Sequence, residues 1–165
     1  MKALGTTIAL FLISISLFSQ EVEYIKMKSI KKPIVQADIN GKKGYFLVDT
    51  GSDISIINTS DLKRYKLEEA KAYGDHRRAI GFNGGKTAVM KVKNARVIFG
   101  QKYDHSEFYS LNISEIIRTI EAKTNIKISG IMGSDLLAKY NCIIDYNQRH
   151  IILVDSRTKR KLAAR

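Results

Sequence analysis

Apolar and polar residues alternate with a period of two along most of this chain. Such alternation is typical of β-strands that bury one face. It is found at residues 33–39, 44–48, 87–92, 96–99, 103–109 and 142–154. Asn40-Gly41 lies between the first two stretches and is a strong signal for a two-residue hairpin turn. The last stretch has a turn signal at Asn147-Gln148. The pattern predicts an all-β fold.

Two segments depart from this alternation and predict short helices. At residues 114–124, Ser114 can cap a helix that places Ile116, Ile117 and Ile120 on one face. A second short helix is expected at residues 134–140. With 165 residues and 44% hydrophobic content, the chain suits one domain around one core, and two large lobes would not fit.

One carboxylate stands at the end of an apolar strand, at Asp49. Leu47 precedes it, and Ile54 and Ile56 resume the apolar alternation after the loop Asp49-Thr50-Gly51-Ser52. Gly51 lets the backbone turn back, and the hydroxyls of Thr50 and Ser52 with the Gly51 N–H could donate to the carboxylate. This arrangement suits an aspartate that activates water. An ordinary turn or helix cap is the structural alternative.

This chain resembles the retropepsin-like aspartic peptidases. The resemblance rests on Asp-Thr-Gly-Ser between two apolar runs, on the later Gly130-Ile131-Met132-Gly133, and on a closing hairpin near the C-terminus, and it covers about residues 32–154. It implies a retropepsin-like acid-protease barrel with one or two short helices and no cofactor. It also implies that Asp49 is catalytic, that Thr50, Gly51 and Ser52 support the active-site loop, and that Ile131, Met132 and Gly133 form a second loop.

A glycine-rich segment, Gly81-Phe82-Asn83-Gly84-Gly85, precedes the strand expected at residues 87–92. The resemblance implies that Phe82, Asn83, Gly84 and Gly85 form a flap that closes over substrate, with Phe82 touching it. A plain exposed β-turn is the alternative, because glycine hairpins are common.

The chain contains a single Asp-Thr-Gly, whereas this chemistry needs two carboxylates that share one proton. The resemblance therefore implies a homodimer that pairs two copies of Asp49. Ser134 departs from the family, since viral members often carry an arginine there that supports the dimer. Asp53 and Asp135 could be proposed as replacement partners, but turn or helix-cap roles suit them better.

Residues 1–20 read as a secretory signal peptide, because Lys2 is their only charge and residues 8–18 form an apolar run broken only by serines. We expect an N-terminal segment at 21–31, the retropepsin-like domain at 32–155 and a basic tail at 156–165. The protein is then exported to a periplasm or secreted. Anchoring by an uncleaved N-terminal segment is the alternative, and only then is a membrane contact expected.

The formal net charge is +12, and lysine and arginine concentrate at residues 26–32, 76–78 and 157–165. Solvated faces and a tail explain these runs best, and no nucleic-acid partner is expected, because no nucleic-acid motif accompanies them. The lone Cys142 excludes an intrachain disulfide and suits a small core residue. The scattered histidines, His76, His105 and His150, predict no metal site.

These observations support three hypotheses. The leading one is a homodimeric aspartic endopeptidase that hydrolyses polypeptides with an Asp49-activated water. The second is a catalytically silent retropepsin-like module that binds peptides or dimerises. The third is a small basic β-barrel that binds an anionic polymer, which requires the Asp-Thr-Gly match to be accidental.

Overall fold

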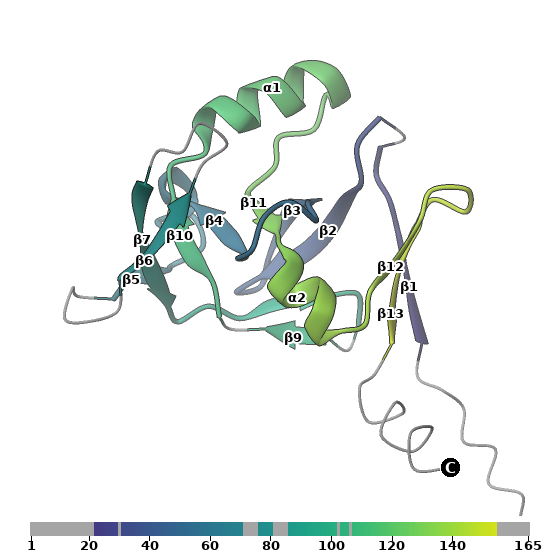
Figure 1. Ribbon diagram of the computed structural model, residues 1–165, viewed down its shortest axis with the longest axis horizontal. Coiled ribbons are helices and arrows are strands. Elements are labelled where there is room, and N and C mark those ends of the chain that lie inside the picture. The colour runs from purple at the N-terminus through teal and green to yellow at the C-terminus, as the bar shows by residue number, and fades with distance from the viewer. Residues whose placement is uncertain are drawn as a thin grey trace, which may run out of the picture.

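The computed structural model describes residues 22–29, 31–70, 76–80, 86–101, 103–105 and 107–154. Within these ranges, β-strands dominate and two helices, α1 and α2, pack beside them (Figure 1). The predicted all-β class with one or two short helices is therefore confirmed. Neither helix in these ranges is long and apolar enough to cross a bilayer.

The elements follow one another in the following order. They are β1 (Val22–Lys26), β2 (Ile34–Ile39), β3 (Lys42–Val48), β4 (Ile56–Asn58), a short 3-10 helix (Thr59–Asp61), β5 (Glu68–Glu69), β6 (His76–Ile80), β7 (Lys86–Lys93), β8 (Val97–Phe99), β9 (Tyr103–His105), β10 (Tyr109–Leu111), α1 (Ser114–Thr124), β11 (Gly130–Met132), α2 (Ser134–Lys139), β12 (Ile143–Asp145) and β13 (His150–Val154).

The larger sheet has the strand order β5-β7-β10-β4-β11-β3-β2-β8-β9, with β6 paired to β7. The hairpin predicted at Asn40-Gly41 joins β2 to β3, and both turn residues adopt positive φ, as a tight hairpin turn requires. No pairing among the described strands joins β5 to β9. The expected barrel is therefore an open sheet in this part of the chain.

Strand β11 occupies a position that the linear sequence does not suggest. It runs between β3 and β4, parallel to β3, with Met132 opposite Val48 and Gly130 opposite Phe46. The C-terminal ends of β3 and β11 therefore emerge side by side. This register brings the Asp49 loop next to the second predicted loop.

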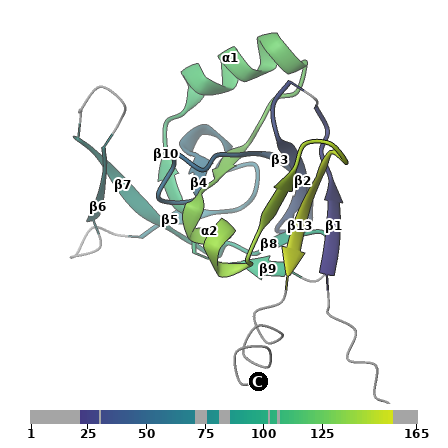
Figure 2. The same cartoon turned by 45° about the vertical axis from the view of Figure 1, so that its right-hand side comes forward.

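A smaller sheet of order β1-β13-β12 packs against the larger one, and Figure 2 shows β1 and β13 side by side. Within the predicted N-terminal segment, β1 pairs with β13 along its whole length, and Ile25 and Met27 are buried in the larger of two apolar clusters. That cluster also contains Phe46 and Leu136, so the strand before Asp49 and helix α2 share one core.

Helix α1 has the predicted bounds and covers the second apolar cluster. Ile117 and Ile120 are buried, but Ile116 is 42% exposed, so its predicted place on the buried face is wrong. The buried stripe is centred on Ile113, Ile117 and Ile120, and Ile116 lies at its edge. Ser114 begins the helix instead of capping it, since Ile113 is the N-cap residue and has no side-chain cap bond.

Candidate active site

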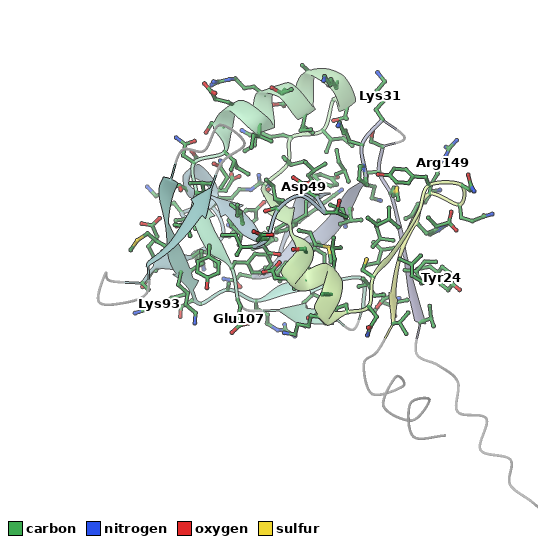
Figure 3. All side chains as sticks on the ribbon, in the orientation of Figure 1. Tyr24, Lys31, Asp49, Lys93, Glu107 and Arg149 are labelled. Atoms are coloured by element: carbon green, nitrogen blue, oxygen red, sulfur yellow. The ribbon has the colours of Figure 1, made fainter. Side chains whose placement is uncertain are left out.

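Asp49 is the first residue after β3, and the residues that precede it fix its position. Val48 is buried, and the N–H of Asp49 donates to the carbonyl of Met132 at 3.0 Å. The Asp49 side chain itself is half-buried. Figure 3 labels it near the centre of the molecule. A carboxylate in this position is held rigidly at its base while water can still reach it.

The Asp49 loop closes on its own carboxylate. The N–H of Gly51 donates to Asp49 Oδ1 at 3.0 Å, and the N–H of Ser52 donates to the Asp49 carbonyl at 3.3 Å. A Cβ added to Gly51 would lie 3.3 Å from Asp49 Oδ1, which is a tight contact. Gly51 therefore contributes a donor and the space in which the carboxylate sits.

The two hydroxyl residues of the loop do not bind the carboxylate as the sequence suggested. Ser52 Oγ donates to the carbonyl of Ile54 at 2.8 Å, and a serine hydroxyl has one proton to donate. The expected Ser52 bond to Asp49 is therefore wrong, and Ser52 instead stabilises the loop's own turn. Thr50 is exposed, as a residue that meets a partner molecule would be.

The second predicted loop lies directly against the first. The N–H of Gly133 donates to Ser55 Oγ at 3.0 Å, and the N–H of Ser134 donates to the Ser52 carbonyl at 2.7 Å. A Cβ on Gly133 would lie 2.5 Å from the Ile54 carbonyl oxygen, so no other residue fits without a backbone shift. Ile131 and Met132 are buried in β11 and supply the apolar support beneath.

The contact between the two loops also involves Asp135 and Ser55. Ser55 was not identified from the sequence as a functional residue. Asp135 accepts from the Ser55 N–H at 2.9 Å, from Ser55 Oγ at 2.7 Å and from the Leu136 N–H at 2.8 Å. Asp135 is thus held in the first turn of α2 and ties that helix to the Asp49 loop. We name this set of contacts, made by Ser52, Ser55, Gly133, Ser134 and Asp135, the loop clamp.

A signal for the loop clamp was present in the sequence. Ser55 is a polar residue inside the apolar run 54–57, and it is completely buried in the structure. A buried hydroxyl needs a hydrogen-bond partner, which a run of isoleucines cannot supply. Asp53, the other carboxylate weighed as a partner for Asp49, is exposed on the same loop.

The predicted flap residues, Phe82, Asn83, Gly84 and Gly85, lie outside the described residues. The strands on either side are described, and β6 pairs antiparallel with β7 so that Ile80 faces Lys86. The hairpin expected around the flap is therefore present, and the role of its tip stays a prediction.

Two further groups bear on the chemistry. Burial raises the pKa of the Cys142 thiol to about 12, and the side chain packs against the core, so it is a poor nucleophile, as expected. In the described ranges, no three residues among His, Cys, Asp and Glu gather where they could hold a metal ion.

Comparison with known sequences decides the family. The sequence profile described as "Aspartyl protease" matches residues 35–136, which include the Asp49 loop and the loop clamp. This chain belongs to the aspartyl protease family. The resemblance read from the Asp-Thr-Gly motif is thus confirmed. No curated protein sequence matches this chain.

Solved structures offer more distant likenesses to this aspartyl protease family member. A retropepsin-like aspartic protease from Rickettsia conorii is 20% identical with a TM-score of 0.48, and the match covers 83% of this chain and 94% of that one. The retroviral protease-like domain of Ddi1 from Leishmania major is 16% identical with a TM-score of 0.47, with coverage of 75% and 92%. The family assignment rests on the sequence profile.

Proposed function

We propose that this protein is an aspartic endopeptidase in which two copies of the chain each supply Asp49. The observation that carries the proposal is half-buried Asp49 at the end of a buried strand: its backbone N–H donates to the Met132 carbonyl, and its carboxylate accepts from the Gly51 N–H. Family membership and the loop clamp support it. The substrate class is an extended polypeptide.

The reaction needs two carboxylates because one must be ionised while the other is protonated. Two like charges held close together cannot both ionise easily, so the pair shares one proton and holds a water molecule. The ionised Asp49 takes a proton from this water, and the protonated Asp49 polarises the scissile carbonyl. Water attacks directly, and no covalent enzyme intermediate forms.

The surroundings of Asp49 have separate roles in this scheme. Gly51 keeps one carboxylate oxygen oriented, and in the proposed dimer Thr50, which is exposed in the single chain, contacts the partner loop across a two-fold axis. The loop clamp supplies rigidity, which matters because misplacement of about 1 Å can cost roughly a hundredfold in rate. We also propose that the protein is exported, with residues 1–20 as the signal.

The decisive experiment compares the chain without residues 1–20 with its Asp49→Asn variant on an unfolded protein substrate, from acid to neutral pH. Each protein is assayed at several concentrations. We expect cleavage that disappears in the variant and a specific activity that rises with concentration, because the dyad forms only in the dimer. Asp53→Asn, on the same loop but exposed, is the matched control and should retain activity.

Three outcomes would contradict the proposal. Cleavage that survives Asp49→Asn excludes Asp49 as the catalytic group. Specific activity that does not change with concentration argues against a dyad formed on association. A folded dimer that cleaves nothing at any pH favours a silent module that binds peptides.

A further inference from the structure

Two adjoining cavities outside the Asp49 site collect positive charge. The first is open, has a volume of about 620 Å³, and is lined by five cationic residues: Lys26, Lys28, Lys31, Lys123 and Arg149. They come from β1 and the segment after it, from the last turn of α1 and from the β12–β13 turn. Figure 3 labels Lys31 and Arg149 toward the same side of the molecule. Among the residues that the structure describes, no aspartate or glutamate lines this cavity.

The second cavity has a volume of about 350 Å³ and is lined by three more cations, Lys43, Arg64 and Lys127. Asn125, which ends α1 in a left-handed conformation, lines both cavities, so they adjoin at this residue. Again the described part of the lining contains no acidic residue. We call the two cavities together the basic cleft.

Two of the three cations of the second cavity, Arg64 and Lys43, make contacts that are not ion pairs with a carboxylate. The Arg64 guanidinium lies 5.1 Å from the centre of the Tyr65 ring and donates to the Lys43 carbonyl at 3.4 Å. Lys43 Nζ lies 5.1 Å from the centre of the Tyr45 ring. Ring faces attract cations without neutralising them. These cationic groups are therefore positioned in advance for an anion.

Nearby carboxylates do not balance the basic cleft. In the described part of the chain, no carboxylate forms an ion pair with any of its eight cations. Asp38 stands opposite Lys43 in the ladder, where its carboxylate also accepts from the Gly41 N–H, and it offsets one positive charge at most. Asp61 lies within electrostatic reach of Arg64 and Lys127; burial raises the pKa of this carboxyl and the two cations lower it, so Asp61 offsets one positive charge at most. The negative end of the α1 helix dipole offsets the charge of one cleft cation, Lys123, which lies in the last turn of that helix.

The aromatic rings at the cleft argue against nucleic acid as its anionic ligand and favour an acidic polypeptide. All eight cations are exposed, so an anionic group can reach them from outside, and binding to anionic vesicles distinguishes a membrane from a polypeptide. Single-stranded nucleic acid binds by stacking bases on free aromatic faces. Tyr65 is completely buried, and Lys43 already lies over Tyr45. Carboxylates on the flexible side chains of a polypeptide can enter both cavities, where lysine ammonium groups attract them as point charges and donate to them.

We propose that the basic cleft is an exosite that binds an acidic segment of the polypeptide substrate. This inference rests on the proposed endopeptidase function and names the class of substrate that the enzyme selects. Asp49 lines neither cavity, so the exosite acts on recruitment and not on the chemical step. Charge complementarity of this kind mainly raises the rate of association and falls with salt.

Binding is tested on the full chain carrying Asp49→Asn, which prevents cleavage of the probe. Fluorescence anisotropy measures the affinity for a labelled short polyglutamate and for polyglutamine of the same length. We expect polyglutamate to bind at low salt and polyglutamine not to bind. Adding Arg64→Gln and Lys127→Gln should weaken polyglutamate binding roughly fivefold or more, as expected for lost close charge pairs.

The matched control is Lys93→Gln with Arg118→Gln, which removes the same net charge outside the cleft. Arg118 is exposed and pairs with Glu115, and Figure 3 labels Lys93 on the side away from Lys31. Equal weakening by both double variants would overturn the proposal, because it would show an effect of net charge alone. Tighter binding to anionic vesicles or to single-stranded oligonucleotide than to polyglutamate would also overturn it.

A second assay separates failure of the exosite from failure of the proposed function. The catalytically intact chain is given one peptide substrate with and without an acidic tail. We expect the ratio of kcat/KM for the tailed over the untailed substrate to fall in the cleft variant and not in the control. Cleavage of both substrates with an unchanged ratio overturns the exosite alone, whereas absence of any cleavage overturns the proposed function.

Discussion

Charged side chains are held differently in the Asp49 site and in the basic cleft. Around Asp49, neutral donors bind carboxylate oxygens one by one: the Gly51 N–H binds Asp49, and the Ser55 N–H and hydroxyl bind Asp135. In the cleft, aromatic rings and a carbonyl contact Lys43 and Arg64, and no described carboxylate forms an ion pair with any of the eight cations. The comparison indicates that the carboxylate proposed for catalysis is held in one orientation by hydrogen bonds. The surface proposed for binding needs only a high density of positive charge.

The largest effect is expected from Gly133→Ala, in the loop that lies against the Asp49 loop. The new Cβ would meet the Ile54 carbonyl at 2.5 Å, and backbone atoms cannot move aside cheaply. We expect a loss of about 3 kcal/mol in the free energy of unfolding, measured in urea, with loss of cleavage. Gly51→Ala is the contrasting variant, since its Cβ contacts only Asp49 Oδ1 at 3.3 Å. It should reduce activity more than stability, and equal stability losses would contradict this account.

Next in size is Asp135→Ala, which removes the acceptor of three hydrogen bonds and leaves the buried Ser55 N–H without its partner. We expect a loss of about 2 kcal/mol in stability and a fall in kcat at unchanged KM, because the Asp49 loop loses its support while the substrate contacts remain. Unfolding in urea and steady-state kinetics give the two values. Asp135→Asn keeps one acceptor oxygen and should recover part of both. A rise in KM alone would contradict a positioning role.

A smaller effect is expected from Ser52→Ala. Its hydroxyl binds the Ile54 carbonyl and not the Asp49 carboxylate. We expect a loss of about 1 kcal/mol in stability, as for one hydrogen bond, and no shift in the pH profile of cleavage. A profile displaced along the pH axis would show that the hydroxyl reaches the carboxylate during the reaction.

The smallest effect concerns Asp61, next to the basic cleft. Burial raises its pKa above the ordinary value of 3.8, which means that the folded protein favours the protonated form. Its contribution to stability is therefore present below the ordinary pKa and is lost as the pH rises through the raised one. Urea unfolding at acid and neutral pH should show the native chain losing stability relative to Asp61→Asn as the pH rises. A constant difference would contradict the raised pKa.

The sequence predicted the elements that depend on neighbours in the chain. The β2–β3 hairpin follows from Asn40-Gly41, the bounds of α1 follow from helical periodicity, and the place of Asp49 follows from the apolar run before it. Each depends on local backbone preferences and burial. Such preferences can be read from a short window of sequence.

Contacts between distant segments could not be predicted in this way. The loop clamp joins Ser55 to Asp135 only because β11 inserts between β3 and β4. No local sequence pattern predicts this strand order. The basic cleft is assembled from segments on either side of α1 and from the β12–β13 turn. Lys26, Lys28 and Lys31 belong to a run that the sequence suggests is a solvated face, and their position beside the other cations of the cleft appears only after folding.

The terminal sheet has a consequence for how this chain is made. Strand β13 lies between β1 and β12, and its pairing of Val154 with Val22 joins the two ends of the described chain. The ribosome synthesises β1 before β13, so the β1–β13 pairing cannot form until β13 has left the ribosome. Closing so long a loop makes this pairing a slow step. Until then Ile25 and Met27, which β13 helps to bury, remain exposed, and a holding chaperone could bind the nascent chain there.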